Sequence, residues 1–412
     1  MPPVLVRHAT LPDGTQADLT LDHGRIATVA PAGSLDPSAT APVTYDLAGY
    51  LLLAAPVEPH AHLDKALTAD LIPNPTGDLL GAVVAYQAHY PDRSVPEITG
   101  RARAALFEYL ANGCTAVRTH VDIGPGIELR GVEALLALRD EFASRLDLQI
   151  VGLVGRPTSG AAGQENRDLL AAGLAAGIDV VGGCPHLDPV PADCLRDCFD
   201  IAVRHGRPLD LHLDENLSPD SNDLAALAEL IGRRGFDLGV TASHCVSLGM
   251  QPADRQHRVA EAVAAAGISV ITLPQTNLFL QGRDHPTATP RGLTAVQALL
   301  SAGVNVAAGG DNFQDPFNLV GRADPLETAA LAVAAAHLDA TAAYHAVSNA
   351  ARRALGLGEV TMRPGDPAEL LAIRAGSVRE AVASARADRL VFHRGVLVAQ
   401  TSVSRGFPSP ES

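Results

Sequence analysis

The feature that most constrains the fold is a regular alternation between short apolar stretches and longer amphipathic ones. Between the apolar stretches, hydrophobic residues recur with helical spacing, as at 132–146, 221–235 and 292–303. Eight such alternations favour a parallel (β/α)8 barrel, a TIM barrel, over the alternative of an open doubly wound sheet. The predicted strands lie at 50–57, 114–121, 147–154, 178–183, 208–213, 238–243, 268–273 and 304–308.

The two ends of the chain carry a different pattern. Residues 4–30 and 365–400 alternate polar and apolar side chains and contain turn-forming pairs such as Asp13-Gly14. This pattern is typical of antiparallel strands and hairpins. We therefore expect both ends to meet in one small β-sandwich. The predicted division is 1–54 for the first part of the sandwich, 55–354 for the barrel and 355–412 for the second part.

Composition excludes several partners. The chain has 412 residues and a formal net charge of -15, which argues against binding to nucleic acid polymers or anionic membranes. No apolar run approaches the roughly 18 residues of a membrane span, and no secretion signal is evident. The five cysteines form no C-x-x-C pair, which indicates reduced thiols in a cytoplasmic protein. The sequence is compatible with a monomer or a homo-oligomer.

Polar side chains gather where the predicted strands end, and these ends form the reactive face of such a barrel. A single histidine at a strand end is more often structural than functional. Here histidine or carboxylate residues follow six of the eight strands, and each buried polar group without a partner would cost roughly 1–3 kcal/mol. The residues are His60, His62, Asp64, Lys65, Arg118, His120, Asp122, His186, His212, Asp214, Glu215, His244, Asp311 and Asn312.

A metal ion would remove this cost. His60 and His62 lie two residues apart and therefore point to the same side of a strand. With His212 and Asp311 they would hold one divalent ion, zinc or iron, because imidazole and carboxylate suit both. Such an ion lowers the pKa of a bound water from about 15.7 to about 7 and so provides hydroxide at neutral pH.

Three residues near the predicted ligands have the chemistry for proton transfer. Glu215, three residues after His212, is placed to give a proton to a substrate. His244 is placed to stabilise developing charge or to orient the nucleophile. Asp311 is placed to accept the proton of the water while it contacts the metal.

Seven segments then carry a family resemblance. "PHAHLD", "VRTHVD", "VVGGCPH", "LDLHLDE", "TASH", "TNLFLQGR" and "GGDNFQDPF" occur in this order through nearly the whole barrel. They resemble the cytosine deaminase branch of the amidohydrolase superfamily, whose terminal segments form a composite β-sandwich. The resemblance implies that Glu215 protonates a ring nitrogen and that His244 lies next to the hydrolytic water. It implies that His60, His62, His212 and Asp311 hold a single iron or zinc.

Lysine usage supports a single metal. Binuclear members of the superfamily bridge two metals with a carboxylated lysine from a middle strand, as the resemblance implies. The only lysine in this chain is Lys65, which follows the first predicted strand. A bridged metal pair is therefore not expected.

The substrate-binding positions depart from the cytosine deaminase pattern. Gly155 stands where cytosine deaminases carry a glutamine that pairs with the pyrimidine, and Asn312 stands where they carry aspartate. "HLDK" and the Asp-Asn pair are more similar to N-isopropylammelide isopropyl amidohydrolase, whereas "TNLFLQGR" is more similar to the deaminase. Arg156, next to Gly155, is a candidate for binding an anionic group. The candidate substrate contacts are Lys65, Gly155, Gln281 and Asn312.

The sequence thus predicts a hydrolase of non-peptide C–N bonds. The favoured reaction is removal of an exocyclic amine from a small nitrogen heterocycle by attack of metal-bound hydroxide, with little activity on cytosine. One alternative is hydrolysis of a cyclic amide or N-alkylamino heterocycle. A second, an inactive binding protein, is disfavoured because the ligands and Glu215 are intact. The H-x-E and P-C-x-x-C motifs of a different zinc deaminase fold do not occur.

Overall fold

The computed structural model describes residues 2–37 and 43–407, and most of them belong to a parallel barrel. Its strand order is β13-β12-β11-β10-β9-β8-β7-β6. A bridge between Ala61 and Asp311 joins the first strand to the segment after the last, and this bridge completes the ring. The strands are β6 (Val57–Ala61), β7 (Ala116–Ile123), β8 (Asp147–Val154), β9 (Val180–Gly183), β10 (Leu209–Leu213), β11 (Val240–His244), β12 (Ser269–Thr272) and β13 (Val306–Ala308).

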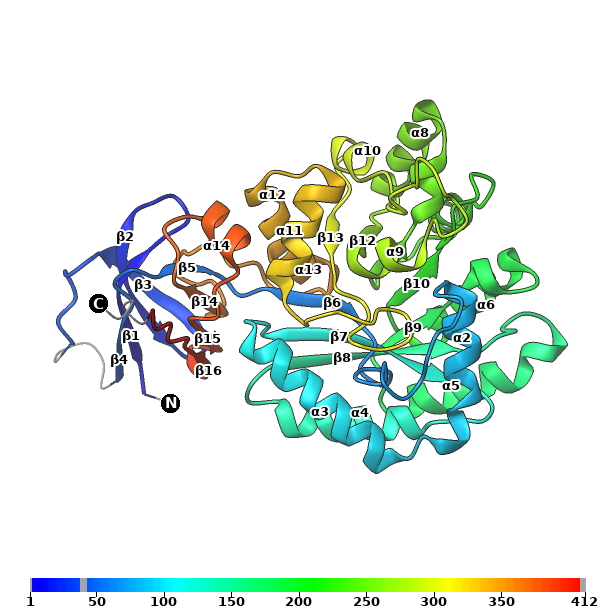
Figure 1. Ribbon diagram of the computed structural model, residues 1–412, viewed down its shortest axis with the longest axis horizontal. Coiled ribbons are helices and arrows are strands. Elements are labelled where there is room, and N and C mark those ends of the chain that lie inside the picture. The colour runs from blue at the N-terminus through cyan, green and yellow to red at the C-terminus, as the bar shows by residue number, and fades with distance from the viewer. Residues whose placement is uncertain (1, 38–42, 408–412) are drawn as a thin grey trace, which may run out of the picture.

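Helices surround the barrel, as the predicted alternation requires (Figure 1). In α4, for example, Leu135, Leu138 and Phe142 share the buried face at helical spacing. Gly206 ends α6 in the left-handed conformation that glycine adopts readily. The helices are α2 (Leu79–Ala88), α3 (Val95–Ala111), α4 (Arg130–Phe142), α5 (Gln164–Ala176), α6 (Pro191–His205), α7 (Asp223–Arg234), α8 (Ala253–Ala265), α9 (Pro274–Leu280), α10 (Val296–Ser301), α11 (Pro325–Ala336), α12 (Ala340–Val347) and α13 (Asn349–Ala354).

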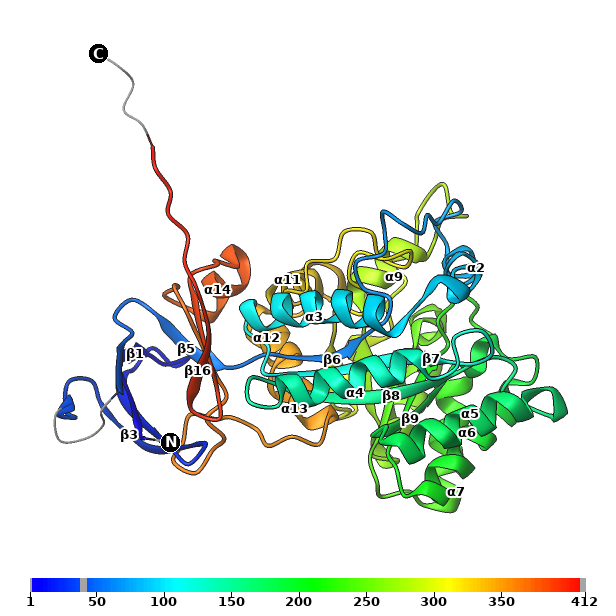
Figure 2. The same ribbon diagram turned by 90° about the horizontal axis from the view of Figure 1, so that it is seen from below.

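A second sheet lies beside the barrel and is built from both ends of the chain (Figure 2). Its order is β16-β15-β14-β5-β1-β2-β3, and β4 pairs with β1. The antiparallel pairing of β5 with β14 joins the two ends, and residues such as Leu19, Leu52 and Phe392 form a separate core. The strands are β1 (Val4–Thr10), β2 (Gln16–Asp22), β3 (Arg25–Pro31), β4 (Val43–Asp46), β5 (Leu51–Ala54), β14 (Leu370–Ile373), β15 (Arg389–His393) and β16 (Val396–Thr401).

These findings confirm the predicted barrel with a β-domain from both termini, with two differences. The predicted strand 50–57 is divided: β5 belongs to the terminal sheet, and the barrel strand is β6. Both strands are buried on both faces, so apolar periodicity could not show where the chain leaves one sheet for the other.

The second difference is α14 (Val378–Ser384), a helix within the predicted hairpin region. Ser377 caps its N-terminus, because the Ser377 hydroxyl accepts from the backbone N–H of Glu380 at 3.2 Å, and a serine before the helix is a signal present in the sequence. The domain boundaries at 54/55 and 354/355 stay a prediction.

The state of the cysteines and the length of the apolar helices were also predicted from the sequence. All five cysteines are free thiols. Within 2–37 and 43–407, none of the helices combines the length and the apolar character that crossing a bilayer requires.

Candidate active site

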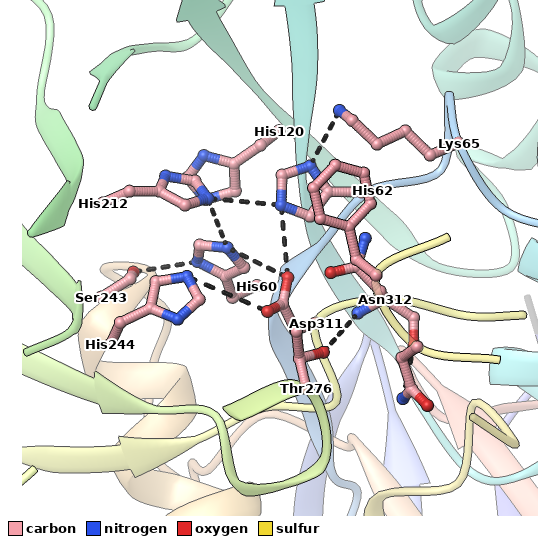
Figure 3. Close-up of polar contacts among 12 residues, drawn as sticks. His60, His62, Lys65, His120, His212, Ser243, His244, Thr276, Asp311 and Asn312 are labelled. Carbon is pink, nitrogen blue, oxygen red and sulfur yellow. Dashed lines mark hydrogen bonds and ion pairs between the residues drawn. The ribbon is translucent and has the colours of Figure 1, made fainter. Parts of the chain in front are cut away.

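Four side chains from three distant segments converge at one end of the barrel (Figure 3). The Nε2 atom of His60 lies 3.1 Å from Nε2 of His212, which in turn lies 3.3 Å from Nε2 of His62. The Oδ1 atom of Asp311 lies 3.6 Å from Nε2 of His60 and 3.2 Å from Nε2 of His62. The three imidazole nitrogens thus lie within 4.8 Å of one another, and the carboxylate of Asp311 adjoins two of them.

The protonation states of this cluster suit a cation. Burial, followed by the positive charge that each neighbour would carry, lowers the pKa of His60, His62 and His212 well below the usual value. The imidazoles are therefore neutral at neutral pH and offer a lone pair. Neither carboxylate oxygen of Asp311 has a hydrogen-bond partner among the described side chains and backbone groups. A divalent metal would satisfy the cluster, because neutral imidazole and carboxylate are its usual ligands.

A chain of polar contacts fixes the orientation of His60. The Ser243 hydroxyl donates to Oδ1 of Asp210 at 3.2 Å, and Ser243 Oγ lies 2.9 Å from Nδ1 of His60. Asp210 is paired with Arg118 at 2.9 Å. Because the hydroxyl hydrogen is directed to Asp210, the Ser243 oxygen accepts the Nδ1 proton of His60. The Nε2 atom of His60 then has no proton and is free to bind a metal.

Glu58 ties two ligand-bearing segments together. One carboxylate oxygen accepts from the backbone N–H of His60 at 3.0 Å, and the other accepts from Gly310 at 2.9 Å, next to Asp311. Gly309 leaves room for this contact, because a Cβ there would lie 2.6 Å from the carboxylate. Glu58 is not among the predicted site residues, although a carboxylate within an apolar run is a signal visible in the sequence.

Replacement of Glu58 with Gln is expected to lower metal affinity by roughly 10- to 100-fold. The amide keeps one acceptor but turns its NH2 group toward a backbone N–H, which loosens either His60 or Gly310. Competition with a metal chelator measures this affinity, and thermal unfolding of the two proteins monitors the fold. A variant that holds metal as tightly as the parent would show that this bridge does not position the ligands.

Several strand-end residues have a strained backbone. Asp214, His244 and Asp311 have positive φ values of 52°, 68° and 64°. This conformation costs on the order of 1–3 kcal/mol for a residue other than glycine and is concentrated at functional sites. At Asp311 it is held by a hydrogen bond from the backbone N–H to the carbonyl of His60 at 3.0 Å. The surrounding structure therefore fixes the direction of these side chains.

Glu215 and His244 lie next to each other in the same buried space. Oε1 of Glu215 is 3.5 Å from Nδ1 of His244, and Nε2 of His244 is 3.9 Å from Oδ2 of Asp311. Burial, and then the charge of Asp311, raises the pKa of Glu215 well above the usual value. This shift favours the protonated carboxyl group, which is the form that can donate a proton.

His244 is neutral and has a defined tautomer. Burial lowers the pKa of His244 to about 4. The amide nitrogen of Asn277 lies 3.0 Å from Nδ1 of His244 and donates to it, so the ring proton is on Nε2 and faces Asp311. Asn277 lies within "TNLFLQGR" but was not singled out from the sequence.

Lys65 is buried beside the cluster. Its Nζ lies 2.7 Å from Asp122, 3.4 Å from Asp64 and 3.3 Å from Nδ1 of His62. The hydroxyl of Tyr90 donates to the second oxygen of Asp122. Burial alone would lower the pKa of Lys65, but Asp122 and Asp64 outweigh it and raise the pKa. A permanent cation with two carboxylate partners therefore lies beside the cluster.

A cavity of about 460 Å³ opens above the cluster. Of the four predicted substrate contacts, Lys65, Gly155 and Asn312 line it, as do Glu215 and Arg156. Asn312 also donates its amide hydrogen to Asp315 at 2.8 Å. Gln281 is not among the lining residues; its amide donates to the backbone carbonyl of Glu215 at 3.3 Å. Its position indicates support of the Glu215 loop.

Comparison with known proteins agrees with this geometry. Residues 74–399 match the model of the family described as the amidohydrolase family. A pterin deaminase of Rhizobium rhizogenes is 30% identical over 393 residues, which cover 93% of this chain and 88% of that protein.

Two solved structures are similar over almost their whole length. The 5-methylcytosine deaminase of Klebsiella pneumoniae, liganded with 5-fluorocytosine, has a TM-score of 0.89 and 30% identity, and the match covers 98% of this chain and 99% of that one. The N-isopropylammelide isopropylaminohydrolase of Burkholderia multivorans has a TM-score of 0.84 and 29% identity, with coverage of 97% and 99%.

The barrel and its buried cluster of histidines and a carboxylate define a metal-dependent hydrolase. The chain belongs to the amidohydrolase family, and it acts on non-peptide C–N bonds.

Proposed function

We propose that the protein is a hydrolytic deaminase that removes an exocyclic amine from a small nitrogen heterocycle. The single observation that carries this proposal is the buried carboxyl group of Glu215 in a cavity that also exposes the His/Asp cluster. A protonated carboxyl group at this place can activate a ring C=N bond. The names of two relatives, a pterin deaminase and a 5-methylcytosine deaminase, support the same reaction.

In this proposal His60, His62, His212 and Asp311 hold one zinc or iron ion. When bound, the ion supplies an acidified water whose pKa is near 7. Asp311 would accept one proton from a water molecule at this cluster while the water oxygen forms a bond to the ring carbon that bears the amine. Glu215 gives its proton to the adjacent ring nitrogen, which makes that carbon more electrophilic. His244 keeps its Nε2 proton toward Asp311 and orients the carboxylate.

The remaining steps restore both carboxyl groups. Asp311 passes its proton to the amine, which leaves as ammonia when the C–N bond breaks. The new hydroxyl group on carbon returns a proton to Glu215 and becomes a carbonyl. The product therefore carries a ring N–H and a C=O group in place of C=N and C–NH2. Lys65 and Asn312 line the cavity and are placed to hold the heterocycle.

One specific observation favours a second candidate function. Asn312 follows the proposed metal ligand Asp311, and this Asp-Asn pair resembles N-isopropylammelide isopropyl amidohydrolase. In that case the group released would be an alkylamine rather than ammonia.

The two reactions are separated by their products. We would incubate the purified, metal-loaded protein with pterin, isocytosine, 5-methylcytosine and N-isopropylammelide, and measure ammonia, alkylamine and the product mass. The proposal requires ammonia from at least one amino-heterocycle. Alkylamine from N-isopropylammelide without ammonia from the others would establish the second function.

Cytosine itself is expected to be a poor substrate, with kcat/KM at least about 10-fold below that of the best substrate in this panel. The reason is that Gly155 has no side chain to pair with the amide edge of the base. Steady-state kinetics of ammonia release checks this. Cytosine as the preferred substrate would show that another group recognises that edge.

A further inference from the structure

Arg156 is a charged side chain of the cavity that the proposed reaction does not use. It directly follows Gly155 after β8, the third strand of the barrel, and it lines the cavity in a half-buried position. Across the described ranges 2–37 and 43–407, no acidic side chain comes within 4.0 Å of its guanidinium group. Its charge is thus not neutralised by the protein.

The nearby carboxylates are occupied elsewhere. Asp188, on the adjacent loop, accepts hydrogen bonds from the backbone N–H of Thr158 at 2.7 Å and of Val190 at 3.0 Å, and from Ser159. Asp122 pairs with Lys65. Glu165, which also lines the cavity, is exposed and lies beyond ion-pair distance of Arg156. An anion from outside the chain would therefore compete only with water for the guanidinium group of Arg156.

Arg156 and the proposed proton donor Glu215 line the same cavity. Arg156 and Glu215 follow the third and fifth strands of the barrel, so they lie on the same rim, two strands apart. A single ligand can therefore reach both.

The end of β8 offers a charge where related enzymes offer a carboxamide. A Cβ at Gly155 would lie 2.9 Å from the carbonyl oxygen of Ile123 and 2.7 Å from Oδ1 of Asn166, so this position has no room for a side chain. The cavity of about 460 Å³ lies within the usual range of roughly 300–1,000 Å³ for ligand sites, which is more than one six-membered ring needs. There is space for a substituent that reaches Arg156.

We infer that Arg156 binds a carboxylate carried by the substrate, so that the preferred substrate is an amino-heterocycle with an anionic substituent rather than a neutral base. A guanidinium group matches a carboxylate with two parallel hydrogen bonds. The other cation of the cavity, Lys65, already has two carboxylate partners, so the site suits a single negative charge. Among the described residues that line the cavity, Arg156 is the cation without a carboxylate partner, so a substituent bound to it leaves the amine at the Glu215 end. The inference rests on the proposed deaminase function.

Matched substrate pairs test this inference: isocytosine with and without a ring carboxylate, and pterin with and without one. For the parent protein we expect the carboxylated member of at least one pair to have a kcat/KM about 10-fold higher or more. The variant Arg156→Met is expected to lose roughly 10- to 100-fold in kcat/KM on that member, mainly through KM, and to change by less than about 3-fold on the neutral member. Arg156→Lys is expected to recover part of the loss because it keeps the charge but not the paired geometry.

Arg196→Met is the matched control, because it removes an arginine from the exposed surface of α6, outside the cavity. It is expected to leave both substrates unaffected. Equal losses on neutral and carboxylated members in Arg156→Met, or no preference of the parent for either carboxylated compound, would overturn the inference. If no ammonia is released from these four compounds or from 5-methylcytosine, the proposed function fails instead. In that case the inference is tested by calorimetry alone: the carboxylated compounds should bind more weakly to Arg156→Met than to the parent protein.

Discussion

Replacement of Glu215 with Gln is expected to leave the metal content close to that of the parent protein and to lower kcat by roughly 10²- to 10⁴-fold. The carboxyl group lies 3.5 Å from His244 and is held protonated by burial, whereas an amide of the same shape cannot give up a proton at a useful rate. The four proposed metal ligands are unchanged, so the variant should fold and load metal normally.

Elemental analysis and steady-state ammonia release, measured on the same preparation, check both parts of this expectation. Glu261→Gln is the control, since it changes a carboxylate on the exposed face of α8. A Glu215→Gln protein that keeps most of its turnover would remove Glu215 as the proton donor. Loss of metal in the variant would assign Glu215 a structural role instead.

Replacement of Asp311 with Asn is expected to reduce both metal content and turnover, with kcat lowered by roughly 10²-fold or more. The change removes the negative charge that faces His60 and His62, and it removes the base that takes the proton of the water. Asn tolerates the positive φ of 64° at this position, so the backbone should persist.

Metal titration, turnover and thermal unfolding of Asp311→Asn separate these effects. The variant should unfold in one transition, should need more metal for saturation, and should remain slow when it is saturated. Asp254→Asn, an exposed change at the start of α8, serves as control. Full activity of the saturated variant would leave Asp311 as a ligand only and would require another base.

The sequence predicted the barrel because local periodicity is sufficient for that purpose. Seven predicted barrel strands overlap the observed ones from β7 to β13, since each is a short apolar run between helical segments. The first predicted barrel strand was not separated from β5, because the hydrophobic periodicity does not change where the chain passes from one buried sheet to another. The polar residues at the strand ends were enough to predict which side chains lie together. In the structure, each proposed metal ligand has a side-chain nitrogen or oxygen within 3.6 Å of a ligand atom of another: His60, His62, His212 and Asp311.

The residues that sequence reasoning missed act through contacts between distant segments. Glu58 bonds Gly310, which is 252 positions away, and Ser243 contacts His60 across 183 positions. Neither pair has a local pattern, because each depends on the closure of the barrel. The pairing of Lys65 with Asp122 depends on the same closure, because Asp122 comes from the next strand. The roles of the individual site residues stay predictions until they are tested by substitution.

The most direct test of the account is elemental analysis of the purified protein, combined with removal and return of the metal. The account predicts about one zinc or iron per chain, loss of activity when a chelator removes it, and recovery in proportion to the metal restored. Active protein without a transition metal, or a His212→Ala variant that keeps both metal and turnover, would contradict it.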